Sequence, residues 1–188
     1  MESKTEIRAR LLLQRRALPT EAVTRRSKAI HQHLFGLEVF RAAQSVFSYV
    51  SSKDGEVDTL AVIERLLGSG REVHCPGAGM QRTLEWRKIS KIDDLVPGRF
   101  SILEPHSACL VSDTSKGEVV LVPGIAFSAR GERIGYGGGY FDRFLTSFRG
   151  VSIGLAFDMQ MVESIPVEPH DTPVQMLVTE SGVYHCQP

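Results

Sequence analysis

The chain has 188 residues, of which 42% are hydrophobic and 23% are charged, and this composition predicts one globular domain over residues 1–188. The 22 basic residues balance the 22 acidic ones, so no overall field draws the chain to nucleic acid or to a membrane surface. The three cysteines form no C-x-x-C pair, so neither a disulfide framework nor a zinc site is indicated and a reducing cytoplasm fits best. Residues 1–16 contain no apolar run long enough for a signal peptide or a membrane span.

Two helices are predicted before the first strand. Residues 4–16 place Ile7 and Leu11 on one side, a spacing typical of an amphipathic helix. We expect the basic residues of this helix to lie away from that apolar side: Lys4, Arg8 and Arg15. Residues 20–36 carry an apolar stripe of their own and predict the second helix.

The middle of the chain alternates strands and a helix. Residues 45–50 (S-V-F-S-Y-V) are β-branched and aromatic and are followed by turn formers, which predicts a strand and its exit loop. A helix over about residues 60–67 and a strand over 71–75 follow. Residues 83–89 alternate weakly, as in an edge strand, whereas residues 90–116 are rich in turn formers and predict no element.

The last third is easier to interpret. Residues 118–123 (E-V-V-L-V-P) are typical of a strand that is buried on both faces of a parallel sheet. Large residues at i, i+3, i+4 and i+7 over 141–148 predict a helix with one apolar face. Residues 151–157 alternate large side chains with serine, glycine and alanine, so one face of this strand is nearly bare and permits close approach. Residues 176–179 predict one more strand.

The order of these elements predicts the fold class. Helices that alternate with short apolar strands favour an α/β domain with three layers, α/β/α, and a mainly parallel sheet. Ligands of such sheets collect beyond the carboxyl ends of the strands. We therefore expect a site among the loops after Val50, Val122 and Phe157.

A glycine loop stands between two of these elements. Residues 133–143 read R-I-G-Y-G-G-G-Y-F-D-R, with four glycines in five positions. Glycine backbones can turn successive N–H groups inward as an anion-binding nest, and a helix that begins after the loop adds its positive end. Polyphosphate would suit such a site, with Asp142 holding a magnesium ion and Arg130 and Arg133 neutralising phosphate oxygens. A wide turn, with Asp142 only balancing the helix dipole, explains the same residues equally well.

Two common phosphate signatures do not fit this loop. A dinucleotide fingerprint would need glycine where Tyr140 stands, and the chain contains no G-x-x-x-x-G-K-[ST] motif.

Four motifs in this order resemble the 5-formyltetrahydrofolate cyclo-ligase family. The longest is V-P-G-I-A-F-S-A-R-G-E-R-I-G-Y-G-G-G-Y-F-D-R-F-L over residues 122–145. K-T-E-I-R at 4–8 resembles the family's amino-terminal element, G-E-V-D-T at 55–59 its folate-side loop, and I-P-V-E-P-H-D at 165–171 its second acidic motif. The resemblance covers essentially the whole chain and is more specific than any one motif.

The resemblance implies a reaction. The family closes 5-formyltetrahydrofolate to 5,10-methenyltetrahydrofolate while ATP becomes ADP and phosphate, with Mg²⁺ as cofactor. The γ-phosphoryl group is transferred to the formyl oxygen, N10 of the same folate attacks, and phosphate leaves, so no protein nucleophile is needed. It also implies a monomer that acts on small molecules and a fold like that of sugar-phosphate isomerases and coenzyme A transferases.

The resemblance also implies roles for particular residues. ATP contacts fall on the first helix and the glycine loop: Lys4, Thr5, Glu6, Ile7, Arg8, Arg133, Ile134, Gly135, Tyr136, Gly137, Gly138, Gly139, Tyr140 and Phe141. Folate contacts fall at Tyr49, Val50, Glu56, Trp86, Tyr136, Gly137, Gly138, Gly139 and Tyr140. The implied catalytic residues are Arg133 and Asp142, and the implied magnesium ligands are Asp142 and Asp171.

Without the resemblance, several of these residues have simpler explanations. The basic residues of the first helix would form a solvated face, and Glu56 would be a surface charge on a loop. Tyr49 and Val50 would be core residues, and Trp86 would be a partly buried aromatic of an edge strand. Asp171 would be a turn former.

The chain departs from the family pattern at two positions of the loop. Tyr136 stands where arginine is often found, and Gly138 stands where some relatives carry lysine. We expect another cation to compensate, from among Lys4, Arg8, Arg130 and Arg133. Two other functions stay open: a sugar-phosphate isomerase, which needs neither ATP nor magnesium, and a folate-binding paralogue that has lost turnover.

Overall fold

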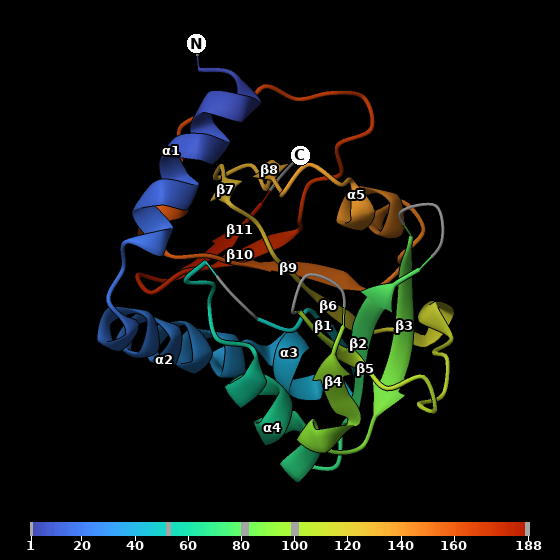
Figure 1. Cartoon of the computed structure of the whole chain (residues 1–188). Coiled ribbons are helices and arrows are strands. Elements are labelled where there is room, and N and C mark those ends of the chain that lie inside the picture. The colour runs from blue at the N-terminus through green and yellow to red at the C-terminus, as the bar shows by residue number, and fades with distance from the viewer. Residues whose placement is uncertain (1, 52–53, 80–82, 99–101, 187–188) are drawn as a thin grey trace.

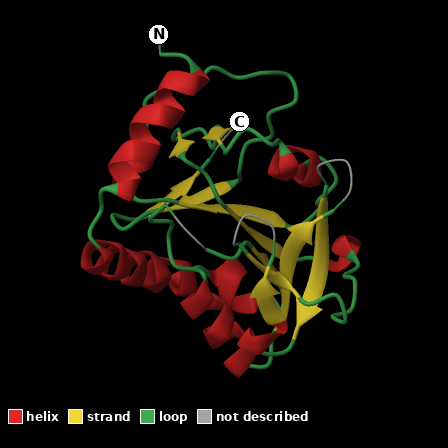
Figure 2. Ribbon diagram, viewed as in Figure 1, coloured by secondary structure: helices red, strands yellow, loops and turns green. Residues whose placement is uncertain are grey.

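A seven-stranded sheet with helices on both faces forms the centre of the molecule (Figures 1 and 2). The computed structural model describes residues 2–51, 54–79, 83–98 and 102–186. The strand order is β11-β10-β9-β6-β1-β2-β3. The strands from β10 to β2 are parallel, and β11 and β3 are antiparallel to their neighbours at the two edges. Their bounds are β1 Ser45–Ser48, β2 Glu72–Ala78, β3 Leu84–Ile89, β6 Val119–Val122, β9 Val151–Leu155, β10 Met176–Val178 and β11 Val183–His185.

Helices cover both faces of this sheet. Helices α2, α3 and α4 lie on one side, and α1 and α5 lie on the other (Figure 1). Their bounds are α1 Lys4–Arg16, α2 Thr20–Gly36, α3 Glu38–Ala42, α4 Leu60–Gly68 and α5 Tyr140–Leu145, with short 3-10 turns at Ile92–Asp94, Thr114–Lys116 and Asp158–Gln160. Two small ribbons complete the fold: β4 Leu95–Pro97 with β5 Leu103–Pro105, and β7 Ala126–Phe127 with β8 Arg133–Ile134. Within the described part of the chain, no helix is long and apolar enough to span a membrane.

Alternate residues of the strands supply two separate cores. In β1, Val46 packs with the core under α2 to α4, and its neighbour Phe47 packs with the core under α5. In β6, Leu121 and Val122 divide in the same way. Successive side chains of a strand point to opposite faces, so a strand that is covered on both faces needs apolar residues throughout. This burial explains the unbroken apolar run of β6.

The bare face of β9 is covered by an aromatic ring. A Cβ atom on Gly154 would lie 2.8 Å from Phe127 Cε1, so only glycine leaves room for the ring. Phe127 belongs to β7, which pairs with β8 through Phe127 and Arg133. Close approach to this strand is confirmed, and it seats the ribbon that leads into the glycine loop.

Most predicted elements are confirmed, with differences at their ends. The α/β class and the mainly parallel sheet are found, and β3 is an edge strand as predicted. Strand β1 ends at Ser48, so Tyr49 and Val50 belong to the exit loop. Helix α5 ends at Leu145, and Phe148 packs on the core from the turn that follows. The sequence did not predict α3, β4, β5, β7, β8 or β11.

A buried histidine in β2 makes stability depend on pH. His74 bonds through its two ring nitrogens to Ser45 Oγ, at 3.2 Å, and Ser112 Oγ, at 2.7 Å, and it stacks on Phe47 with ring centroids 4.4 Å apart. Burial lowers the pKa of His74, with Lys88 acting in the same direction and Glu72 opposing it. Because the folded state favours the neutral ring, this stabilisation is complete above the unfolded pKa near 6.5 and is lost as the pH falls below it.

We therefore expect His74→Gln to lose part of the acid sensitivity of folding. The difference in the free energy of unfolding between wild type and variant should shrink as the pH is lowered from 7.5 to 5.5. Urea unfolding at both pH values measures it. An equal difference at the two pH values would contradict the role given to His74.

Candidate functional site

A cavity of about 740 Å³ opens at the carboxyl ends of the parallel strands. Tyr49 and Val50 follow β1 into its wall, and Pro123 follows β6. The position agrees with the expectation for parallel sheets, where loops and helix ends converge. The rest of the wall comes from α1, the loop after β1, the end of β2, the start of β3, β5 with the residue before it, the glycine loop and a segment near the carboxyl terminus: Lys4, Arg8, Glu56, Pro76, Gly77, Ala78, Leu84, Ile102, Leu103, Glu104, Arg133, Ile134, Gly135, Tyr136, Gly137, Gly138, Gly139, Tyr140, Phe141, Asp142, Glu168, His170 and Asp171.

The glycine loop needs glycine at two positions for its backbone. Gly137 and Gly139 have φ values of 96° and 66°, in the left-handed region that other residues rarely adopt. Two arginines hold the loop by its carbonyl groups: Arg8 Nε donates to Gly135 O at 2.9 Å, and Arg143 Nη2 donates to Gly138 O at 2.7 Å. The loop conformation is therefore stabilised by Arg8 of α1 as well as by residues of the loop itself.

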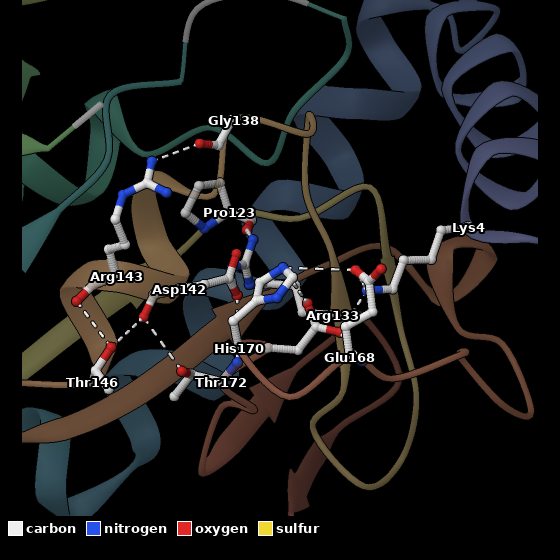
Figure 3. A network of polar contacts seen from close by, with 11 residues as sticks. Lys4, Pro123, Arg133, Gly138, Asp142, Arg143, Thr146, Glu168, His170 and Thr172 are labelled. Carbon is white, nitrogen blue, oxygen red and sulfur yellow. Dashed lines mark hydrogen bonds and ion pairs between the residues drawn. The ribbon is translucent and has the colours of Figure 1, made fainter. Parts of the chain in front are cut away.

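An ion pair joins the two ends of this loop. Arg133 Nη2 lies 2.7 Å from Asp142 Oδ1 (Figure 3). The two side chains are 4% and 17% exposed. Burial lowers the pKa of Arg133, and the Asp142 carboxylate opposes that shift. Thr172 also contacts Asp142, through its hydroxyl to the backbone carbonyl at 3.3 Å. This contact brings the residue next to Asp171 against the start of α5.

A second cluster of charges faces the same cavity from α1. Lys4 Nζ lies 2.7 Å from Glu168 Oε2 (Figure 3). It also lies 2.5 Å from Asp171 Oδ2. Burial acts to lower the pKa of Lys4, and its hydrogen bonds to the two carboxylates outweigh that effect and raise it. Burial likewise acts to raise the pKa of Asp171, and the hydrogen bond from Lys4 helps to lower it instead. The contact keeps Lys4 a cation and Asp171 an anion.

Ligands for a hard cation are available here. Side-chain ligand atoms of Glu168, His170 and Asp171 lie within 4.8 Å of one another. Asp142 lines the same cavity. Carboxylate oxygens are the protein ligands that Mg²⁺ prefers, so the carboxylates of Glu168, Asp171 and Asp142 suit that ion better than the imidazole of His170.

On the opposite wall, Glu56 meets the glycine loop. The Tyr136 hydroxyl donates to Glu56 Oε1 at 3.0 Å and accepts a short hydrogen bond from Arg15 Nη2. Arg15 is only 2% exposed, so its predicted place away from the apolar side of the helix is wrong. The predicted compensating cations did not include Arg15, yet its guanidinium is the one that reaches the Tyr136 hydroxyl.

Several predicted site residues lie outside the cavity wall. Thr5 and Glu6 are exposed on α1, where the Glu6 carboxylate accepts from Ser3 in a capping box, and Ile7 is buried against β7 and β8. Trp86 is 2% exposed and packs on Phe47 and Phe144, so the edge-strand explanation agrees with its place.

Arg130 also lies outside the cavity wall. Its guanidinium forms an ion pair with Glu132 at 3.0 Å. Its predicted role as a neighbour of the phosphates therefore has no support from its position.

Sequence reasoning missed one wall of the cavity. Pro76 to Ala78, Leu84 and Glu104 come from the ends of β2 and β3 and from β5. The antiparallel pairing of β2 with β3 places Pro76 to Ala78 beside Leu84, and Glu104 comes from the β4–β5 ribbon. No sequence motif indicates that these segments meet. The sequence does indicate that Glu168 and His170 belong to the site, since both lie inside the acidic motif at 165–171.

The fold and the site together define a class. The chain is an α/β protein that presents a glycine loop, cations and carboxylates to a small-molecule cavity at the carboxyl ends of its parallel strands. The family model for 5-formyltetrahydrofolate cyclo-ligases matches residues 1–180. The chain therefore belongs to the 5-formyltetrahydrofolate cyclo-ligase family.

Individual relatives agree with this membership. A 5-formyltetrahydrofolate cyclo-ligase of Mycolicibacterium smegmatis is 30% identical over 185 residues, covering 94% of this chain and 93% of the relative. One from Escherichia coli is 37% identical over 142 residues, covering 71% and 76%. The NMR structure of Aquifex aeolicus 5,10-methenyltetrahydrofolate synthetase superposes with a TM-score of 0.88 at 30% identity, covering 98% of this chain and 93% of that one.

The Arg133–Asp142 ion pair yields a stability prediction. Asp142→Ala leaves a buried guanidinium without its carboxylate and should lower the free energy of unfolding by about 3 kcal/mol. Asp142→Asn keeps an acceptor oxygen and should cost less. Urea unfolding measures both, with Asp113→Ala as the control because that carboxylate is 56% exposed. A loss no larger than that of the control would show that the pair does not hold the loop.

Proposed function

We propose that this chain catalyses the ATP- and Mg²⁺-dependent closure of 5-formyltetrahydrofolate to 5,10-methenyltetrahydrofolate, with release of ADP and phosphate. One observation carries the proposal: the first helix, the folate-side loop, the glycine loop and the acidic segment lie far apart in the sequence, and all four contribute to one cavity. Cations and carboxylates stand together there, as phosphoryl transfer requires.

The proposed roles follow the walls of the cavity. Lys4, Arg8 and Arg133 bind the phosphates of ATP together with the backbone of the glycine loop. On the other wall, Glu56 accepts hydrogen bonds from the amino-pyrimidine ring of the folate, and Tyr49 and Val50 pack against the ring system. The substrate then has its formyl oxygen toward the γ-phosphate and its N10 close to the formyl carbon. Most of the rate acceleration therefore comes from holding one molecule in the reactive orientation.

Asp142 and Asp171 are the proposed magnesium ligands. When bound, Mg²⁺ neutralises the charge that develops on the phosphate oxygens. Each of these carboxylates is bonded to a cation that the proposal assigns to ATP, Asp142 to Arg133 and Asp171 to Lys4. When the phosphates of ATP bind Arg133 and Lys4, these cations leave Asp142 and Asp171, and both carboxylates become available to Mg²⁺. Binding of the nucleotide should therefore increase the affinity for the metal, and binding of the metal should increase the affinity for the nucleotide.

The proposal extends to the setting of the reaction. We propose a single-domain monomer that works on small molecules in the cytoplasm and binds neither nucleic acid nor membranes. Equal numbers of acidic and basic residues and three free cysteines support this setting. A fold relationship to sugar-phosphate isomerases and coenzyme A transferases is part of the same proposal.

The decisive experiment follows product formation. Purified protein with 5-formyltetrahydrofolate should produce the methenyl chromophore and an equal amount of ADP only when ATP and Mg²⁺ are both present. A sugar-phosphate isomerase would form neither product, and a non-catalytic paralogue would bind the folate without turnover. Asp142→Asn should lower kcat on the order of 10²-fold while leaving folate affinity nearly unchanged. Full activity of this variant would remove Asp142 from the mechanism.

The link between metal and nucleotide can be tested without turnover. We expect Mg²⁺ alone to leave the Tm of the wild-type protein unchanged, because Lys4 and Arg133 compete for the carboxylates. Mg²⁺ with an ATP analogue that cannot transfer its γ-phosphoryl group should raise it. In Lys4→Met, which removes the competitor at Asp171, Mg²⁺ alone should raise the Tm. An equal rise for wild type with Mg²⁺ alone would contradict the exchange of partners.

A further inference from the structure

Arg15 is a buried cation that has no proposed role in binding ATP, magnesium or folate. It stands in the last turn of α1 and is 2% exposed, as little as Ala43 and Val57 of the apolar core. Removing a guanidinium from water is costly unless its N–H groups find acceptors. The acceptors of the Arg15 guanidinium should therefore explain why a cation occupies this buried position.

The acceptors of Arg15 come from three separate segments of the cavity wall. Its Nε donates to Asp54 O at 2.7 Å, in the loop that carries Glu56. One terminal nitrogen donates to Gly124 O at 3.0 Å, just after β6, and the other to the Tyr136 hydroxyl in the glycine loop. A planar guanidinium fixes the directions of these bonds, so one side chain sets three segments relative to one another.

Tyr136 links Arg15 to Glu56 through two hydrogen bonds whose donor and acceptor are fixed. Arginine only donates, so the phenol oxygen must accept from Arg15 and has its proton left for Glu56 Oε1, 3.0 Å away. Burial, with Glu56 adding to it, raises the pKa of Tyr136 and keeps the phenol protonated. Glu56 Oε1 is therefore an acceptor in this structure, as hydrogen bonds from the amino groups of a pterin ring would require.

The backbone beside Glu56 packs against the same end of α1. Gly55 has a φ of 64°, and a Cβ atom there would lie 2.6 Å from the carbonyl oxygen of Arg15. On the outer side, Arg16 Nε lies 2.6 Å from Asp54 Oδ1. The loop is therefore seated directly on the residue whose side chain reaches Tyr136.

We infer that Arg15 is a positioning residue that orients Glu56 through Tyr136 and so couples the folate wall of the cavity to the glycine loop. The inference rests on the proposed folate role of Glu56. Affinity for the folate should therefore depend on Arg15, which does not line the cavity.

A double-mutant cycle tests the inference. Arg15→Met should raise the KM for 5-formyltetrahydrofolate, and its Kd by calorimetry, by about tenfold or more, as expected for loss of a hydrogen bond to a charged group. The KM for ATP should change much less. Tyr136→Phe removes only the hydroxyl and should raise the same folate constants. The double variant should be no worse than Arg15→Met, because both changes break one relay.

Controls separate positioning from folding. Arg10→Met serves as the matched control, since Arg10 lies on the same helix and its side chain is 42% exposed. All constants are measured below the lowest Tm of the set, and Tyr136, which is 47% exposed, gives a variant that folds if Arg15→Met does not. Arg15→Lys should recover part of the affinity.

The outcomes are distinct. Unchanged folate constants in Arg15→Met and Tyr136→Phe, in a wild type that forms product, overturn the inference alone. Additive effects in the double variant, or tighter folate binding by Tyr136→Phe, overturn it as well. A wild type that neither binds nor converts the folate overturns the proposed function, and the inference with it.

Discussion

The ion pair between Arg133 and Asp142 sets the shape of the site. It joins Arg133, at the start of the glycine loop, to Asp142, in the first turn of α5, at 2.7 Å and largely away from solvent. The backbone between them includes Gly137 and Gly139 in left-handed conformations, so the loop has little regular structure of its own. A salt bridge that closes such a loop confines a segment that would otherwise have many conformations.

The position of Arg133 depends in turn on a glycine in the central sheet. Gly154 leaves room on β9 for the ring of Phe127, and Phe127 pairs with Arg133 across the β7–β8 ribbon. Ile134, the next residue, packs with Ile7 and Leu11 of α1. Core packing therefore fixes the ribbon from both sides, and the ribbon presents the arginine to Asp142. The polar site is built on apolar contacts that the glycine-loop motif does not contain.

The sequence predicted the sheet and the motif-bearing loops well, because both depend on local patterns. The unbroken apolar run of β6 and the alternation in β9 report burial on particular faces, and glycines report backbone conformation. The wall from the ends of β2, β3 and β5 was not predicted, since it depends on which strands are neighbours. Trp86 is buried and is not among the residues that line the cavity, and the sequence identifies it as an aromatic residue in an edge strand without showing which face it occupies.

The prediction for Arg15 is wrong for a different reason, which concerns the spacing of basic and apolar residues along α1. Lys4, Arg8, Leu11 and Arg15 follow the spacing i, i+4, i+7 and i+11, which places them on one stripe of α1. Leu11 is 1% exposed and Arg15 2%, so this stripe faces inward. The prediction for Arg15 follows from the exposed position that cations usually occupy. A basic stripe that includes a core leucine cannot be a solvated face, since the leucine fixes which side is buried, and its cations must therefore meet buried acceptors or an anionic ligand.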